Sequence, residues 1–253
     1  MAHQNKIEEQ RLPKVPVEWF AEAEPPWMDQ GDAAALLHTT HPRVVFLKTL
    51  PRSARVLDVG AGEGSLHVFR GWLLPGRTNL KIYAYALEKG SAFDSCDGFE
   101  IGRWPDQKPN FAGAGFDAIY ASHFIEHIPE PIGFLEWAVT RLNPGGRIYC
   151  EWPSEHSLDQ DRREAFHARD IPIMISHFHD DPTHQMSIPK RKHVVQALEA
   201  GGLLIDQEGF ITNPFLETEA LAHYKIGNPD MFMLQSAFWS RARWAQYVIA
   251  TKL

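Results

Sequence analysis

Disulfides and membrane segments are what this sequence offers least of. Only two cysteines, Cys96 and Cys150, occur among its 253 residues, which predicts free thiols in a reducing compartment and therefore a cytoplasmic protein. No apolar run approaches the ~18 residues that a bilayer requires, and the first ten residues, MAHQNKIEEQ, lack the apolar core of a signal peptide. We therefore expect no contact with a membrane.

The basic residues are too few and too scattered for a nucleic-acid protein. Lys and Arg number 25 against 32 Asp and Glu, which gives a formal net charge of −7 at pH 7. Because binding to a phosphate backbone needs clustered positive charge, this composition excludes nucleic acid as a partner. A small molecule is the expected partner, and the sequence leaves open whether the protein is a monomer or a homodimer.

The most informative stretch of the chain is Arg55–Ser65, RVLDVGAGEGS. A short apolar run over residues 56–59 predicts a buried parallel strand, and residues 65–72 after the glycines predict a helix. Glycines at a strand-to-helix turn allow a tight bend and let a ligand approach the backbone without meeting a Cβ atom. Asp58 stands just before this bend, where its carboxylate can face the same ligand. The alternating glycines are Gly60, Gly62 and Gly64.

An acidic residue follows at the spacing expected for ribose binding. Leu80–Ala86 predicts a second strand, and Glu88 comes 24 positions after the last glycine of the loop. An acid about 20 residues beyond such a loop can accept hydrogen bonds from both hydroxyls of a ribose. We therefore expect Glu88 to bind a nucleoside rather than to lie free in solvent beside Lys89.

Further motifs appear in a fixed order and carry a resemblance to a known family. Five motifs are similar to those of class I S-adenosylmethionine-dependent methyltransferases. They are VLDVGAGEG, the strand end ALE at residues 86–88, FDAI at 116–119, SHFIEHIPEP at 122–131 and LNPGGRIY at 142–149. The last two motifs resemble the small-molecule branch often called methyltransferase type 11. The likeness is dense over roughly residues 50–152 and looser elsewhere.

The resemblance implies an α/β fold, a Rossmann-like seven-stranded and mostly parallel sheet with helices on both faces. Its last strand would run antiparallel beside the sixth. We expect an N-terminal arm with helices over residues 1–50, which either packs on the domain or serves as a lid. The methyltransferase domain would then span 51–253, with an insertion at 152–188. The predicted strands cover 56–59, 80–86, 99–101, 116–121, 147–151, 203–210 and 244–251.

The resemblance also implies S-adenosylmethionine as cofactor and S-adenosylhomocysteine as product. It assigns cofactor binding to Asp58, the three glycines and Glu88, with Ser122 near the ligand at the end of the fourth strand. Many relatives place an aspartate after the third strand to contact the adenine. Gly102–Arg103–Trp104 stands there instead, so we expect backbone groups of Gly102 and Arg103, or stacking on Trp104, to make that contact.

Histidines supply the candidates for catalysis. The segment 152–188 is polar and histidine-rich, and its FHDDPTHQ resembles a stretch that approaches the substrate in several sugar and polyketide methyltransferases. An oxygen acceptor benefits from a base that takes its proton, and the ordinary pKa of histidine, ~6.5, suits that role. We name His184 and His123 as candidate bases, with Asp181 as an orienting partner, and expect the insertion to cover the acceptor.

A metal site competes with this interpretation. His177, His179, Asp180 and His184 offer nitrogen and oxygen donors within eight residues. Mg²⁺ prefers oxygen ligands, however, and the segment has no cysteine pair for structural zinc. Methyl transfer needs no metal, because the sulfonium of S-adenosylmethionine already carries a positive charge. We therefore expect no bound metal.

The expected function is methyl transfer to a hydroxyl of a small molecule, a sugar or another polar metabolite. Two alternatives stay open: N-methylation of a small amine, and binding of S-adenosylmethionine without turnover. A nicotinamide oxidoreductase fits less well, because such domains usually carry a hydrophobic residue where Asp58 stands.

Overall fold

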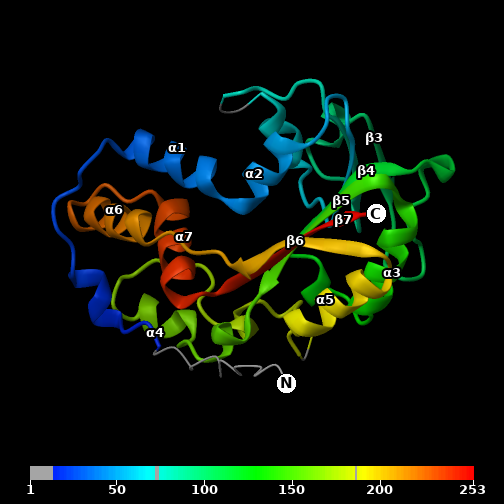
Figure 1. Ribbon diagram of the computed structural model, residues 1–253. Helices are drawn as coiled ribbons and strands as arrows, with labels where there is room; N and C mark the ends of the chain where they lie inside the picture. The colour runs from blue at the N-terminus through cyan, green and yellow to red at the C-terminus, as the bar shows by residue number, and fades with distance from the viewer. Residues whose placement is uncertain (1–13, 72–73, 186) are drawn as a thin grey trace, which may run out of the picture.

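A seven-stranded sheet forms the centre of the computed structural model, which describes residues 14–71, 74–185 and 187–253 (Figure 1). The strand order is β3-β2-β1-β4-β5-β7-β6, and β7 is antiparallel to both of its neighbours while the other pairs are parallel. The predicted fold class is therefore confirmed. The strands are β1 Arg55–Val59, β2 Lys81–Ala86, β3 Gly98–Ile101, β4 Phe116–Ser122, β5 Leu142–Pro153, β6 Leu203–Phe210 and β7 Ala245–Lys252.

Helices fill most of the connections. The α-helices are α1 Gln30–Thr40, α2 Pro42–Thr49, α3 Pro131–Arg141, α4 Arg163–His167, α5 Arg191–Ala200, α6 Pro214–Lys225 and α7 Met231–Ala242. Short 3₁₀ turns are η1 Val17–Ala21, η2 Ser65–Arg70, η3 Phe93–Ser95, η4 Phe111–Gly113, η5 Ile125–His127, η6 Glu155–Leu158 and η7 Phe178–Asp180. None of the helices among the described residues is long and apolar enough to cross a membrane.

One predicted helix is wrong. The stretch after the glycine loop, expected to be helical to residue 72, forms only the 3₁₀ turn η2, which ends at Arg70. Gly64 precedes it in the left-handed region with no side-chain cap, and Gly71 follows it. Glycines at both ends and a missing cap disfavour a longer helix. Residue 72 itself lies outside the described residues, as do residues 1–13 of the expected N-terminal arm.

Alternate residues of the strands build two separate cores, one on each face of the sheet. Val56 of β1 packs with α2 on one face, whereas its neighbour Leu57 packs with α3 and α5 on the other. This alternation is the two-residue period of a strand. Figure 1 shows α2 on one side of the sheet and α3 and α5 on the opposite side. The sheet is therefore buried on both faces, as a parallel sheet requires.

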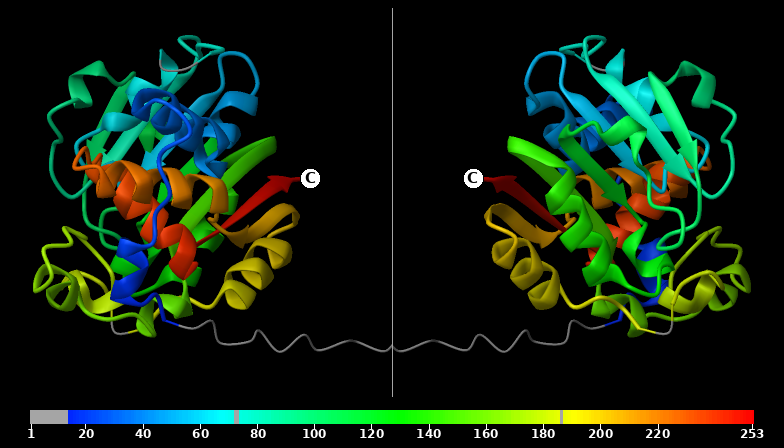
Figure 2. Two further views of the ribbon diagram at one scale, coloured as in Figure 1. Left: turned by 90° about the vertical axis from the view of Figure 1, so that its left-hand side faces the viewer. Right: turned by 90° about the vertical axis from the view of Figure 1, so that its right-hand side faces the viewer.

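A third core joins segments that are distant in the sequence. It brings together η1, α1, α4, α6, α7 and the start of β7 around Phe20, Phe166 and Phe238. Both side views in Figure 2 place the N-terminal segment against α6 and α7. The buried carboxylate of Glu219 on α6 accepts hydrogen bonds from the backbone N–H groups of Trp27 and Met28, at 3.0 to 3.4 Å. The N-terminal segment is thus attached to α6 by polar contacts as well as by apolar packing.

Candidate active site

The first cavity lies over the carboxyl ends of β1, β2 and β4 and has a volume of about 640 Å³. Open α/β sheets bind their ligands at this edge, where the strand order reverses. Several of the predicted cofactor residues border the cavity, whereas Asp58, Gly64 and Ser122 are not among its lining residues. Those that border it are Gly60, Gly62, Glu88, Gly102 and Arg103.

The glycine loop folds as its sequence predicts. Gly60 and Gly62 adopt left-handed φ angles of 74° and 51°, which other residues rarely adopt. A Cβ atom on Gly60 would lie 2.8 Å from Cδ2 of Phe124, so a side chain there would also collide with the next loop. The backbone N–H groups of Gly60 and Ala61 both donate to the carbonyl of Tyr85, at 2.9 and 3.1 Å. The loop is therefore tied to the end of β2, just before Glu88.

Asp58 lies beneath this loop rather than in the cavity wall. Its register partners are Ala84 on β2 and Tyr120 on β4, so strands flank it on both sides. The side chain is buried, and this burial raises its pKa to about 7. The sequence placed Asp58 at the correct strand end, and the structure adds that the residue is enclosed.

The turn after β3 replaces the aspartate that many relatives carry. The N–H of Gly102 donates to the carbonyl of Ala86 at 3.0 Å, and a Cβ on Gly102 would lie 2.7 Å from the carbonyl oxygen of Gln107. Trp104 borders the first cavity, but its ring is 5% exposed and packs edge-on against Phe134 at 5.4 Å.

A second cavity of about 220 Å³ opens on the other side of His123. Its residues come from the end of α1, the start of α2, the segment 211–213 and α7, and include Phe232 and Trp239. Glu151 at the end of β5 lines this cavity, but none of the described residues of the expected insertion, 152–185 and 187–188, does so. The insertion instead contributes Phe166, Ile171 and Ile173 to the third core. The walls of the second cavity are therefore formed largely by the N-terminal helices, the segment 211–213 and α7, and not by the insertion.

His123 borders both cavities. It follows β4 directly and has a φ angle of 53°, an uncommon conformation for a residue with a side chain. Its N–H donates to the carbonyl of Glu151 at 2.8 Å, which holds the backbone in place. Strained backbone of this kind concentrates at functional sites, because the surrounding structure must stabilise it.

Two buried carboxylates flank the His123 ring. Nδ1 lies 2.9 Å from Oε1 of Glu126, and Nε2 lies 3.0 Å from Oε1 of Glu151. Burial lowers the pKa of His123, but these two carboxylates outweigh that effect and raise it to about 9. The ring is therefore an imidazolium at neutral pH, which differs from the ordinary histidine pKa on which the predicted base role rested.

Arg43 and Tyr149 complete this charged group. Arg43 of α2 pairs with Glu151, and the hydroxyl of Tyr149 donates to the other oxygen of the same carboxylate. Burial raises the pKa of Glu151, but Arg43 and His123 outweigh it and hold this pKa well below its usual range. Burial and the neighbouring Arg43 lower the pKa of His41 to about 3, so that ring is neutral.

Sequence reasoning missed Arg43 and Glu151. Glu151 ends the predicted fifth strand, so its place at the ligand edge of the sheet was a usable indication. Arg43 offered none, because the pair joins residues separated by 108 positions.

His184 and Asp181 line neither of these two cavities. The His184 side chain is 3% exposed and stacks on Phe178 with 4.5 Å between ring centroids. Its Nε2 lies 4.0 Å from Asp181. Of the two predicted bases, His123 therefore occupies the cavity wall and His184 does not.

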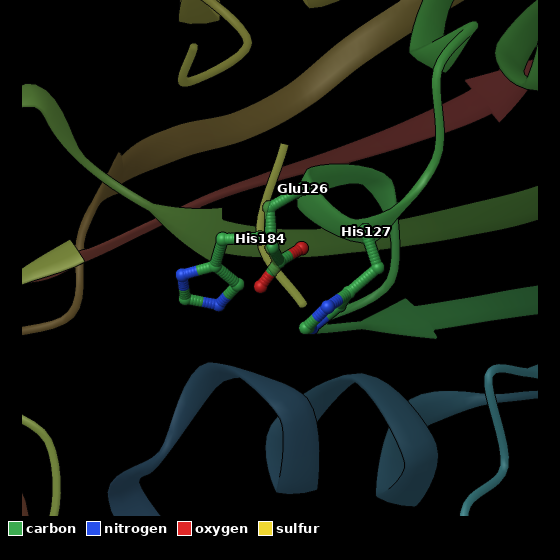
Figure 3. A group of neighbouring side chains, drawn as sticks. All are labelled: Glu126, His127 and His184. Atoms are coloured by element: carbon green, nitrogen blue, oxygen red, sulfur yellow. The ribbon is translucent and has the colours of Figure 1, made fainter. Parts of the chain in front are cut away.

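The four-residue metal alternative is not assembled among the described residues. Oδ2 of Asp180 accepts hydrogen bonds from the backbone of Arg163, Ser176 and His177 and so serves the local fold. Nδ1 of His177 accepts from the N–H of His179 at 3.1 Å. His184 instead faces Glu126 and His127, and Figure 3 shows these three side chains together.

Comparison with known proteins decides the family. The family model described as methyltransferase domain matches residues 31–208. The chain belongs to this family. The matched domain is of the class I methyltransferase kind, and the cofactor of this family is S-adenosylmethionine, which the sequence resemblance implied.

Curated relatives of this methyltransferase match about half of its length. A ubiquinone biosynthesis O-methyltransferase of Xanthomonas axonopodis pv. citri (strain 306) is 28% identical over 134 residues, which cover 49% of this chain and 54% of the relative. One of Xylella fastidiosa (strain 9a5c) is 32% identical over 138 residues, which cover 49% and 52%. The chain therefore spans about half the length of the curated relatives it matches.

Solved structures share the fold at low sequence identity. A cyclopropane synthase of Mycobacterium tuberculosis has a TM-score of 0.53 and 14% identity, with 94% of this chain and 95% of that chain covered. A mycolic acid cyclopropane synthase complexed with SAH and CTAB has a TM-score of 0.52 and 13% identity, with 94% of both chains covered. At these identities the likeness concerns the fold alone.

Proposed function

We propose that this methyltransferase transfers the methyl group of S-adenosylmethionine to a small molecule bound in the second cavity. The observation that carries the proposal is that His123 borders both cavities. A donor in one cavity and an acceptor in the other would meet at this side chain. Alignment of two bound reactants is the main contribution that a protein makes to such a transfer.

The first cavity supplies the cofactor site in this proposal. Glu88 accepts hydrogen bonds from the ribose hydroxyls, while Gly60 and Gly62 let the methionine part lie close to the backbone. Gly102 and Arg103 border the cavity where the adenine would lie. Asp58, Gly64 and Ser122 do not line the cavity, so we assign them no direct cofactor contact in this proposal.

A hydroxyl is the acceptor that the second cavity favours. The methyl group moves from sulfur to oxygen, the sulfonium becomes the neutral thioether of S-adenosylhomocysteine, and the hydroxyl loses its proton. The carboxylate of Glu151 borders the cavity and contacts the His123 imidazolium, so this pair is placed to orient the hydroxyl and to stabilise the negative charge that develops on its oxygen while the proton passes to water. The curated relatives are named as O-methyltransferases, which agrees with oxygen as acceptor.

The size of the second cavity limits the acceptor. About 220 Å³ accommodates a single sugar-sized or ring-sized group, not an extended chain. Phe232 and Trp239 offer flat apolar faces, while Arg43 and Glu151 offer charge at one end. A small amine would leave Arg43 facing a positive group and is therefore the second candidate.

The N-terminal helices α1 and α2 act as the lid of this cavity in the proposal. The two free cysteines agree with a cytoplasmic location.

A matched pair of variants tests this assignment. Formation of S-adenosylhomocysteine is measured with a panel of small sugars, phenols and amines, and the best acceptor is used with both variants. We expect His123→Gln to lower kcat by about 100-fold and to leave the Kd for S-adenosylmethionine within twofold, because Glu88 and the glycine loop, the main cofactor contacts in this proposal, are unchanged. Glu88→Gln should instead weaken S-adenosylmethionine binding by about tenfold, or 1.4 kcal/mol.

The opposite results are equally informative. Full kcat in His123→Gln would remove that residue from the transfer point. Tight binding of S-adenosylmethionine without turnover on any acceptor would favour the non-catalytic alternative. Unchanged cofactor affinity in Glu88→Gln would refute the ribose contact.

A further inference from the structure

Glu126, His127 and His184 form a compact group of donor atoms beside the first cavity (Figure 3). One ligand atom from each residue lies within 4.8 Å of the other two. Glu126 and His127 belong to η5, which follows β4, whereas His184 belongs to the insertion. Two distant segments therefore supply one group, and the proposed methyl transfer uses none of the three as an acceptor contact.

Hydrogen bonds fix which nitrogen of each histidine ring carries the proton. Nδ1 of His184 contacts the carbonyl of Phe178, which can only accept, so Nδ1 is the protonated atom. Thr183 donates its one hydroxyl hydrogen to Oδ1 of Asp181 at 2.6 Å. The 2.9 Å contact between Oγ1 of Thr183 and Nδ1 of His127 must therefore be a bond that His127 donates. Both rings are left with Nε2 as the atom that can offer a lone pair.

The Glu126 carboxylate is buried with one oxygen unused. Oε1 contacts His123, while Oε2 has no hydrogen-bond partner among the described residues, and the side chain is 0% exposed. Leaving a charged oxygen buried without a partner is costly, and a positive ion beside it removes that cost. Figure 3 shows the Glu126 carboxylate between the two imidazole rings.

Backbone contacts hold the two segments in this arrangement. The N–H of Gln185 donates to the carbonyl of Glu126 at 2.8 Å, and its side-chain amide donates to the carbonyl of His127 at 3.0 Å. His184 is therefore flanked in sequence by residues that are each bonded to η5. The ring contacts of His127 with Thr183 and of His184 with Phe178 are of the kind that orients ligating histidines in metal sites.

We propose that Glu126, His127 and His184 bind a first-row transition-metal ion, with Zn²⁺ as the best match to two imidazoles and one carboxylate. Zinc bonds to nitrogen and oxygen of about 2.0 to 2.2 Å bring donors to within roughly 3.5 Å of one another, so small rotations close the site. Three protein ligands leave one position open, the pattern of catalytic rather than structural zinc sites. His127 also borders the first cavity, so the ion lies at its wall.

The sequence favoured no metal, and the donors that it offered for the alternative were His177, His179, Asp180 and His184. Only His184 is common to both sets. The inference rests on the geometry of the three side chains and not on the proposed function, so methyl transfer and metal binding can fail independently.

Direct binding of metal ions to the full chain tests the proposal. After removal of metal with a chelator, Zn²⁺ is titrated by calorimetry, and Co²⁺ is followed by its visible absorption as a probe of coordination. We expect one equivalent to bind, and we expect Glu126→Gln, His127→Gln and His184→Gln each to weaken that binding at least tenfold. His179→Gln is the matched control, because this exposed histidine lies in the same insertion but outside the group.

Far-UV circular dichroism and S-adenosylhomocysteine binding confirm that each variant is folded. Thr183→Ala is a second test that leaves the ligands in place. It should weaken Co²⁺ binding about tenfold, because His127 loses the contact that fixes its tautomer. Failure of the wild-type protein to bind Zn²⁺ would overturn the proposal. Binding that the three ligand variants retain in full, or that only His179→Gln removes, would overturn it as well.

Discussion

His123 shows how one residue can join two halves of a site. Its backbone is strained, its ring lies between two carboxylates, and its side chain borders both cavities. The strain is held by a hydrogen bond to Glu151 from the neighbouring strand, so the same residue fixes both the backbone and the ring. A substitution that preserved only the charge would therefore not reproduce its geometry.

Asp58 provides a pH-dependent prediction at the same scale. Its pKa is raised from 3.8 to about 7 by burial, so the folded state binds more protons than the unfolded state between these values. The free energy of unfolding contributed by this residue is therefore highest below about pH 4 and falls as the pH rises to 7, by up to about 4 kcal/mol. In Asp58→Asn the free energy of unfolding should no longer fall with rising pH on account of this residue.

Urea unfolding of the wild-type and Asp58→Asn proteins at pH 5 and pH 8 measures the effect. The difference in free energy of unfolding, variant minus wild type, should be about 2 to 4 kcal/mol more positive at pH 8 than at pH 5. Cys96 and Tyr120 are the titratable groups that interact with Asp58, and burial raises the pKa of each, so both stay neutral over this range. An equal difference at both pH values would contradict the prediction.

At the scale of secondary structure, the sequence was most informative where a periodic pattern met a turn residue. The seven strands could be predicted from short apolar or alternating runs, and the order of the motifs indicated the family and its antiparallel last strand. The extent of η2 could not be predicted, because its residues favour a helix by composition while the glycines at both of its ends disfavour a longer one. Contacts between distant elements were also inaccessible.

In the candidate site, too, residues close together in the sequence could be predicted and residues from distant segments could not. Glu88 and the glycine loop lie within one strand–turn–strand unit, so their spacing carried the prediction. The second cavity is built from α1, α2, the segment 211–213 and α7, which meet only in three dimensions. Likewise, His184 faces Glu126 across 58 positions, and no local pattern in the histidine-rich segment distinguishes it from His177 or His179.

Arg77 illustrates how a single side chain can end a helix. The last carbonyls of α2 have no partners within the helix, and Pro51 follows directly. The buried guanidinium of Arg77 donates to the carbonyls of Leu47, Lys48, Leu50 and Pro51. Because α2 carries Arg43 at its start, the same contact also holds one wall of the second cavity.

Arg77→Met should therefore destabilise the protein by about 2 to 4 kcal/mol, since several buried carbonyls lose their donors together. The midpoint of urea unfolding measures this, with Arg52→Met as control because Arg52 is exposed next to the same turn. Equal midpoints for the two variants would show that water replaces the guanidinium at no cost.

At the scale of the whole molecule, the third core decides how the second cavity is closed. Residues 14–40 contribute no strand to the sheet, yet Leu37 and Thr40 of α1 border this cavity. The N-terminal segment reaches α1 through Trp27 and Met28, whose N–H groups both bond to Glu219. Lys225 adds a bond from α6 to the carbonyl of Ala23. The segment is thus attached to α6 by hydrogen bonds, and its contact with the sheet is apolar packing near the start of β7, away from β1 and β4.

This separation predicts that the lid can be loosened without disturbing the cofactor site. Glu219→Ala leaves two backbone N–H groups without their acceptor, which should raise amide hydrogen exchange over residues 27–40 by at least about tenfold. Exchange in β1 and β4, and the affinity for S-adenosylhomocysteine, should stay as in the wild type. Glu199→Ala on the exposed face of α5 is the control. Faster exchange throughout the sheet would instead mean that the third core and the sheet unfold as one unit, and α1 would then be part of the scaffold rather than a lid.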